Sequence, residues 1–303
     1  DPATTLDSAL ALRREWSQRW GQPVSAPPVH PNDRDPDRPL RVGYASGDFR
    51  AHSALYCFGP VIRRHSDQIQ AYCYSSLTEA EDPYTQSLKR FATWRDMATL
   101  TDEQFAERVR DDQIDILVDL AGFTTNSRIL VFARKPAPVQ VTAWGYATGT
   151  GLPQMDAFFA DSIVVPDHLR SGYVEEVIHL PSVVPYEEPW VAPFDYVPEV
   201  GTLPYRRHGF ITFGSLNRAE KLNPDVIQAW IAILKAVPDS RLILKSHQLT
   251  LSEVTVKVVG WFDHAGIDPG RLGIVGTTPH AIHTNVLNAV DISLDPFPHT
   301  GGV

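Results

Sequence analysis

Short runs of β-branched and aromatic residues, separated by helical segments, most constrain what this chain can fold into. After Pro39, six such runs follow one another, and several carry apolar residues at consecutive positions, as expected when both faces of a sheet are covered. Apolar strands that alternate with helices are typical of a parallel α/β sheet. The predicted strands are 40–44, 69–74, 114–120, 139–144, 157–160 and 177–180.

A second α/β series follows a proline-rich stretch, 185–207, that is expected to be mostly irregular and to connect two domains. Its predicted strands are 210–215, 241–245, 272–275 and 291–295, with helices at 223–240, near 253–265 and at 278–290. Pro224 and Pro279 fall in the first turns of their helices, where a missing N–H costs least. The predicted segments are 1–38, 39–185, 186–208 and 209–303.

The first segment, 1–38, combines one amphipathic helix with a proline-rich spacer. Its apolar side chains lie roughly on one helical face, and the helix ends before Gly21. The helix could be a lone docking element or the tail of a helical array, because one helix reveals no repeat period. The face consists of Leu6, Ala9, Leu10, Trp16 and Trp20.

Charge and cysteine content narrow the class of protein. With 27 Lys and Arg against 36 Asp and Glu, the formal charge is −9 and the basic residues are scattered, so no nucleic-acid partner is expected. No apolar run approaches membrane-spanning length and no signal peptide is apparent. Cys57 and Cys73 are expected to be buried, reduced thiols of a cytoplasmic protein. The chain lacks an initial Met and stops in an expected loop, so a fragment is expected.

The loop after the first strand, within GYASGDFRAHS (43–53), places His52 where ligands of open α/β sheets bind. Imidazole titrates near neutral pH, so His52 could orient or deprotonate a substrate hydroxyl. Alternatively, the histidine only ties the loop together. Residue spacing does not decide between these roles.

Three segments of the second domain carry candidate ligand-binding residues. Asn217, Arg218 and Lys221 precede a helix N-terminus, which favours anions, although a solvated Arg and Lys on a surface loop would look the same. His280 and His283 are three residues apart in a helical first turn, yet without a third ligand they predict no metal site. Thr300, Gly301 and Gly302 form a turn that would let the backbone approach a phosphate.

Several catalytic signatures are absent from the sequence. There is no GxxxxGK[ST], HExxH or GxSxG, and the run ATGTG (147–151) has Gln154 where a GxGxxG fingerprint needs its third glycine. These absences disfavour P-loop hydrolases and Rossmann dehydrogenases.

From about residue 40 to 303 the chain resembles the catalytic region of the O-GlcNAc transferase family, which includes SPINDLY-type protein O-fucosyltransferases. The resemblance rests on the order of several stretches. These are RVGYASGDFRAHS, IDILVDLAGFTTNSR, FARKPAPVQVTAWGYATGTG with MDAFFAD, FGSLNRAEKLNP, LGIVGTTPHAIH and DISLDPFPHTGG.

This resemblance implies a GT-B fold, with two facing Rossmann-like domains and an N-terminal helical remnant of a tetratricopeptide array. It places His52 near the acceptor as a candidate base and Lys221 at the diphosphate leaving group. It assigns nucleotide-sugar contacts to Thr124, Thr148, Gly149, Asn217, Arg218, Thr278, His280, His283, Thr300, Gly301 and Gly302.

The function implied is an inverting, metal-independent transfer of GlcNAc from UDP-GlcNAc to Ser or Thr hydroxyls of proteins, with no cofactor. The partners would be a nucleotide sugar and an acceptor protein or peptide. Two alternatives remain: a protein O-fucosyltransferase that uses GDP-fucose, and a GT-B module that binds without catalysis.

Overall fold

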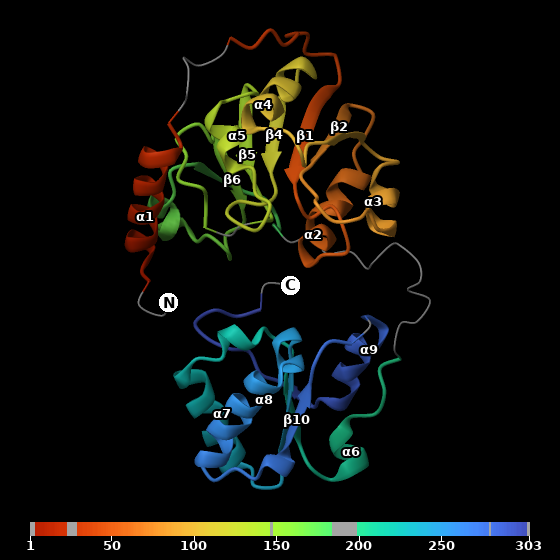
Figure 1. Ribbon diagram of the computed structural model, residues 1–303, viewed down its shortest axis with the longest axis vertical. Coiled ribbons are helices and arrows are strands. Elements are labelled where there is room, and N and C mark those ends of the chain that lie inside the picture. Colours follow the sequence, from red (N-terminus) through yellow and green to blue (C-terminus); the bar gives the residue numbers. More distant parts are fainter. Residues whose placement is uncertain (1–3, 23–28, 146–147, 184–198, 279, 302–303) are drawn as a thin grey trace. The chain divides into compact units, whose positions relative to one another are not determined.

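The protein divides into two compact units, Asp1–Ala192 and Pro193–Val303, in a computed structural model (Figure 1). The structure describes all residues except 1–3, 23–28, 146–147, 184–198, 279 and 302–303. The division supports a two-part chain. The bounds predicted for the four segments stay predictions, and much of the predicted linker 186–208 lies outside the described residues.

Unit 1 is built on a seven-stranded sheet in which every paired strand is parallel. The strand order is β3-β2-β1-β4-β5-β6-β7, so the order reverses between β1 and β4. Its strands are β1 (Leu40–Ser46), β2 (Ile69–Ser75), β3 (Thr93–Asp96), β4 (Ile116–Asp119), β5 (Val139–Thr142), β6 (Ala157–Ala160) and β7 (Glu176–His179). Its helices are α1 (Leu6–Trp20), α2 (Ser53–Arg63), α3 (Pro83–Leu88), α4 (Asp102–Asp111), α5 (Ile129–Ala133) and the 3-10 helix η1 (Asp167–Gly172).

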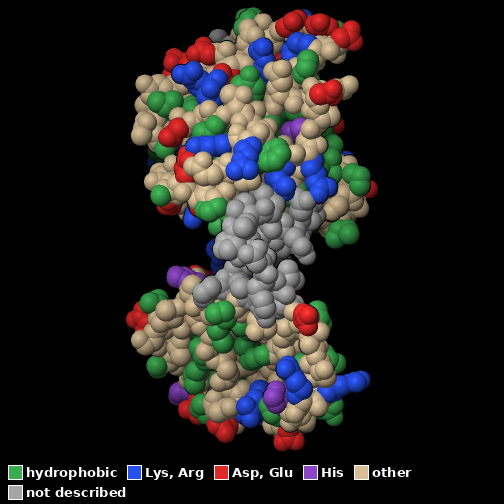
Figure 2. Space-filling view, turned by 90° about the vertical axis from the view of Figure 1, so that its right-hand side faces the viewer, with side chains coloured by type: hydrophobic (Ala, Val, Ile, Leu, Met, Phe, Trp, Pro, Cys, Tyr) green, Lys and Arg blue, Asp and Glu red, His purple; other side chains and the backbone are tan. Residues whose placement is uncertain are grey.

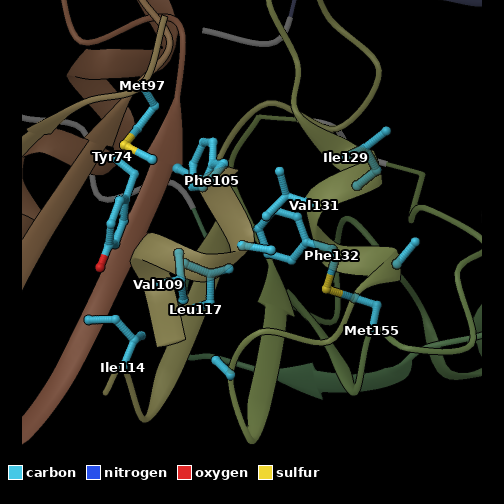
Figure 3. Close-up of a cluster of buried hydrophobic side chains, with 14 of the residues drawn as sticks. Tyr74, Met97, Phe105, Val109, Ile114, Leu117, Ile129, Val131, Phe132 and Met155 are labelled. Atoms are coloured by element: carbon cyan, nitrogen blue, oxygen red, sulfur yellow. The ribbon is translucent and has the colours of Figure 1, made fainter. Parts of the chain in front are cut away.

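The main core of unit 1 lies between the sheet and its helices (Figure 3). Phe105 and Val109 of α4 and Phe132 of α5 are fully buried against Leu117 of β4. Burying a large apolar side chain contributes about 1.5–3 kcal/mol relative to leaving it in water. This packing holds the sheet rigid. The loops described below as part of the candidate site follow the carboxyl ends of its strands.

Unit 2 repeats the same plan with fewer strands. Its parallel sheet has the order β10-β9-β8-β11, which reverses between β8 and β11. Its strands are β8 (Thr212–Ser215), β9 (Arg241–Lys245), β10 (Leu272–Val275) and β11 (Ile292–Ser293). Its helices are α6 (Pro204–His208), α7 (Pro224–Ala236), α8 (Ser252–His264) and α9 (His280–Asn285), with 3-10 turns η2 (Ala219–Lys221), η3 (His247–Thr250), η4 (Pro269–Arg271) and η5 (Val286–Ala289).

Local capping chemistry explains where several helices begin. Thr101 accepts a hydrogen bond from the N–H of Gln104, and its own N–H donates to the Gln104 side chain, so the two residues form a capping box at the start of α4. Asn223 caps α7 by accepting from Val226 N at 3.0 Å, with Pro224 in the first turn as predicted. The matching prediction for Pro279 lies outside the described residues.

Strand β3 is the main element that the sequence pattern does not reveal. Its four residues, TWRD, are polar at both ends and show no apolar run. The strand occupies an edge of the sheet, where only one neighbour, β2, supplies hydrogen bonds and little apolar surface is required. An edge strand of this kind therefore does not need the apolar run by which a buried strand is recognised in a sequence.

On the surface of the described residues, charged side chains are scattered, as expected from the sequence. Figure 2 shows side chains of both signs on each of the two units. Of the helices in the described ranges, none combines the length and apolar character required to cross a bilayer.

Candidate functional site

In unit 1, His52 and Thr124 lie in the loops that follow β1 and β4, the two strands between which the strand order reverses (Figure 1). Loops diverge at such a point and leave room for a ligand. The two loops touch. A Cβ added to Gly47, after β1, would lie 2.7 Å from the Cβ of Asn126, after β4. His52 and Thr124 therefore belong to loops that are in contact.

His52 forms the N-cap of α2. Its Nδ1 accepts a hydrogen bond from the N–H of Ala54 at 3.2 Å and lies 3.8 Å from a carboxylate oxygen of Asp48. Because Nδ1 accepts, the neutral ring carries its proton on Nε2, which is then a donor. This geometry favours orientation of an oxygen atom by Nε2–H. The predicted base role stays a prediction.

Asp119, the last residue of β4, organises the loop that carries Thr124. Its carboxylate is buried and accepts hydrogen bonds from the N–H groups of Ala121 and Gly122 and from the hydroxyl of Thr142. Burial raises the pKa of Asp119, although these hydrogen bonds act in the opposite direction. Thr124 in turn donates from Oγ1 to the carbonyl of Ala121 at 2.8 Å.

The predicted sugar-contacting segment, 148–151, is held by a buried carboxylate that the sequence analysis missed. Glu175 Oε1 accepts hydrogen bonds from the N–H and hydroxyl of Thr150 and from the N–H of Gly151. Gly149 has φ +70°, in the left-handed region that favours glycine. A Cβ at this position would also lie only 2.8 Å from Glu175 Oε2, so both the backbone conformation and the lack of space favour glycine here. The buried hydroxyl of Thr148 has no hydrogen-bond partner among the described residues.

Helix α1 packs behind both of these loops. Arg13 lies so close to Gly151 that a Cβ on the glycine would be 2.7 Å from the arginine Cβ. Trp16 packs edge-on against Phe123, the neighbour of Thr124. Helix α1 is therefore part of unit 1, whatever precedes it in the chain.

In unit 2 the loops after β8 and β11 meet where that sheet reverses its order. Asn217 donates to Asp295 at 2.8 Å, and the N–H of Gly301 donates to the same carboxylate oxygen at 3.2 Å. Lys221 donates to the carbonyl of Thr300 at 2.7 Å and lies 3.4 Å from Asn217 Oδ1. Four predicted residues thus form one cluster. Gly302 lies outside the described residues.

A pocket of about 360 Å³ opens beside this cluster, at the carboxyl ends of β8, β9 and β10. It includes Asn217, Arg218, Thr278 and His283 from the prediction, but the side chain of His280 lies outside the described residues. The lining residues that the sequence analysis missed are Lys245, Ser246, His247, Gln248, Leu216, Gly276 and Thr277. The polar side chains directly after the apolar strand RLILK could have revealed several of them.

The pocket lining is biased toward positive charge. Arg218 and Lys245 line it together with two histidines, and its described lining residues include no Asp or Glu. Among the described residues of the whole chain, no group of three or more His, Cys, Asp or Glu could hold a metal ion. The absence of a metal from the reaction stays a prediction.

Comparison with known proteins identifies the family. The family described as Glycosyl transferase family 41 matches residues 24–185, just over half of the chain. The chain belongs to glycosyl transferase family 41. The resemblance to O-GlcNAc transferases stated from the sequence is therefore confirmed.

Relatives of known name extend the match along the chain. The "Probable UDP-N-acetylglucosamine--peptide N-acetylglucosaminyltransferase SPINDLY" of Arabidopsis thaliana is 32% identical over 310 residues, covering 97% of this chain and 32% of that protein. The protein of the same name from Solanum lycopersicum is 31% identical and covers 98% of this chain. The chain spans about a third of the length of these curated relatives.

Solved structures establish the fold class. A mutant of the Thermobaculum terrenum O-GlcNAc transferase matches with a TM-score of 0.90 and 32% identity, over 99% of this chain and 56% of that one. The lipopolysaccharide outer core galactosyltransferase WaaB matches with a TM-score of 0.54 at 10% identity, a likeness of fold alone. The predicted α/β fold of the GT-B class is confirmed.

Proposed function

We propose that this member of family 41 is a glycosyltransferase that moves GlcNAc from UDP-GlcNAc to a Ser or Thr hydroxyl of an acceptor protein, with inversion and without a metal ion. The observation that carries the proposal is the position of Lys221. Its ammonium lies at the reversal point of the unit 2 sheet and donates a hydrogen bond to the carbonyl of Thr300, the neighbour of Gly301. Family membership and the names of its relatives support the transfer of GlcNAc from UDP-GlcNAc to a peptide or protein.

The chemistry requires one bond to form as another breaks. The acceptor oxygen attacks the anomeric carbon from the side opposite the diphosphate, and the bond from that carbon to the phosphate oxygen breaks. Its electron pair leaves on the UDP β-phosphate, while the hydroxyl proton passes to a base or to the departing phosphate. Negative charge therefore grows on the diphosphate, where a fixed cation is most effective.

Lys221 and Arg218 are the two side chains proposed to supply positive charge at the diphosphate. Lys221 is fixed by hydrogen bonds to Thr300 O and Asn217 Oδ1, and Arg218 lines the adjacent pocket. With two positive groups at the diphosphate, the leaving group needs no divalent ion. Activity is expected to persist in excess chelator, and its loss on chelation with recovery on adding Mg²⁺ or Mn²⁺ would remove this part of the proposal.

On the acceptor side, His52 is proposed to orient the attacking hydroxyl. Its side chain is about one-third exposed (32%), which leaves it accessible at the carboxyl edge of β1. Thr124 and the segment 148–151 are proposed to contact the sugar. Accurate placement of the two reacting atoms accounts for much of the rate in a reaction of this type.

The decisive experiment is transfer to peptide or protein acceptors by the purified protein, followed by mass spectrometry. Addition of one N-acetylhexosamine from UDP-GlcNAc supports the proposal, whereas addition of deoxyhexose from GDP-fucose would replace the donor. Binding of nucleotide without transfer from any donor would identify a non-catalytic module.

Lys221→Ala tests the role of the cation directly. Turnover is expected to fall about a hundredfold or more, the scale for loss of one charge-stabilising group. Lys235→Ala is the matched control, because Lys235 is an exposed lysine on α7. Equal activity of the two variants would refute the role given to Lys221.

We also propose that the protein acts in the cytoplasm on protein acceptors, with no nucleic-acid or membrane partner. Cys57 and Cys73 are both free and buried, which fits a compartment where thiols stay reduced. Fractionation of cells that express the tagged protein tests this location, and enrichment in a secreted or membrane fraction would contradict it.

A further inference from the structure

The ammonium group of Lys245 lies buried in unit 2 without a counter-ion. The residue ends β9 and is 4% exposed. No carboxylate of the described residues pairs with it. Its Nζ instead donates to the carbonyl of Gly276 at 2.9 Å and to Oγ1 of Thr278 at 2.8 Å. Burial lowers the pKa of Lys245, as expected for a cation removed from water with only neutral partners.

A buried lysine is costly unless all its donors are used. An ammonium has three N–H donors, and the two hydrogen bonds above account for two of them. Lys245 also lines the 360 Å³ pocket. A third donor at the wall of a pocket calls for a hydrogen-bond acceptor on the molecule that fills it.

The position of Lys245 along the sheet indicates which part of a nucleotide it meets. A diphosphate is expected at the reversal point between β8 and β11, where Lys221 lies. Strand β8 lies at that point, β9 is the next strand beyond β8, and β10 is the strand beyond β9. Neighbouring strands are about 4.8 Å apart. The base end of a nucleotide anchored at the reversal point would therefore reach β9 and β10.

The neighbours of Lys245 fit a nucleobase. Both of its partners, Gly276 and Thr278, belong to the loop after β10, which leads into α9 and His283 at the same pocket. Uracil and guanine carry a carbonyl oxygen where cytosine and adenine carry an amino group. An ammonium only donates, so it pairs with the carbonyl oxygen and leaves an amino group without a partner.

We propose that Lys245 is a specificity-determining residue, whose free N–H donates to the carbonyl oxygen O4 of uracil or O6 of guanine and so selects these bases over cytosine and adenine. The inference rests on the proposed function, because it assumes that the pocket holds a nucleotide. It goes further by assigning base selection to a residue that is not among the nucleotide-sugar contacts implied by the family resemblance.

Calorimetric titration of the purified protein with UDP, CDP, GDP and ADP tests the proposal. The wild-type protein is expected to bind UDP at least about tenfold more tightly than CDP, or GDP more tightly than ADP, the scale of one specific base contact. Lys245→Met, which removes the donors at similar length, is expected to abolish that ratio. Lys235→Met, an exposed lysine on α7, is the control and should leave the ratio unchanged.

The outcomes separate this proposal from the function on which it rests. If wild-type protein binds none of the four nucleotides, the proposed function fails first. If it binds with a preference that Lys245→Met retains, or if Lys245→Met weakens all four equally, base selection by Lys245 is refuted while nucleotide binding stands. Equal weakening of all four nucleotides is the result expected if Lys245→Met only loosens the loop after β10.

A second measurement avoids the variant altogether, in case Lys245→Met does not fold. The diphosphate of 2-pyrimidinone riboside lacks the O4 oxygen of UDP but keeps the sugar and both phosphates. Wild-type protein is expected to bind it at least about tenfold more weakly than UDP. Equal binding of the two compounds would overturn the proposal.

Discussion

Trp16 of α1 packs edge-on against Phe123, with 4.9 Å between the ring centroids and planes at 88°. Phe123 immediately precedes Thr124, and Arg13, one turn earlier on α1, contacts Gly151. One helix thus supports both loops that we assign to the sugar. The support comes from a segment far away in the sequence, so it depends on the tertiary fold.

Replacement of Trp16 tests whether this support matters for activity. Trp16→Ala should cost about 1–3 kcal/mol of stability, below the 3–5 kcal/mol of a fully buried tryptophan, and should lower turnover because both loops lose their backing. Trp20→Ala is the control on the same helix, since Trp20 is 57% exposed. Denaturant unfolding and transfer rates measure the two effects. Equal rates for both variants would show that α1 only stabilises unit 1.

Glu175 gives a second test of the same loop, through hydrogen bonding. Glu175→Ala would leave three donors of Thr150 and Gly151 without their acceptor, at about 1–3 kcal/mol for each buried group left unsatisfied. Glu175→Gln keeps an oxygen at Oε1 and places its amide nitrogen at Oε2, which has no hydrogen-bond partner among the described residues. The Gln variant should therefore stay close to wild type in thermal unfolding, and a loss as large as that of the Ala variant would contradict the assigned hydrogen bonds.

Most strands of the two sheets were predictable from the sequence because they carry apolar residues at consecutive positions. The predicted runs 157–160, 241–245 and 272–275 coincide with β6, β9 and β10. Helix 278–290 was predicted as one element, whereas α9 ends at Asn285 and a 3-10 turn, η5, follows. The spacing of apolar residues does not distinguish an α-helix from a 3-10 turn near the end of a helix.

Polar residues shortly after a strand made part of the candidate site predictable, as with Asn217 after β8. Glu175 and Lys245 were missed for different reasons. Glu175 reaches the segment 148–151 across 24 or more residues of chain, a contact that no local pattern encodes. Lys245 ends an apolar run and, in sequence, resembles an ordinary surface lysine at the end of a strand.

His65 makes stability depend on pH near neutrality. Its Nε2 lies 2.7 Å from the Tyr44 hydroxyl, and burial lowers the pKa of the imidazole below 6.5. The unfolded chain therefore binds the proton first as the pH falls, and this share of the stability is present above about pH 6.5 and lost below it. The imidazole should titrate below 6.5 by NMR. The difference in unfolding free energy between wild type and His65→Gln should shrink from pH 7.5 to 5.5, and a constant difference would contradict the assignment.

His52 offers the sharpest separation of a structural from a functional role, because its structural role is N-capping. His52→Ala removes the cap on α2 and should cost about 0.5–2 kcal/mol of stability. Asparagine is among the best N-cap residues, so His52→Asn should restore most of that loss.

Activity then distinguishes the two roles. If Nε2–H orients the acceptor hydroxyl, His52→Asn will fold like wild type and still transfer slowly, because the shorter amide does not reach the position of the imidazole. A slow but stable Asn variant, compared with wild type over a range of pH, would place His52 in the reaction. If the Asn variant instead transfers sugar at the wild-type rate, His52 is a helix cap alone, and the acceptor must be oriented by another group at the carboxyl edge of β1 and β4.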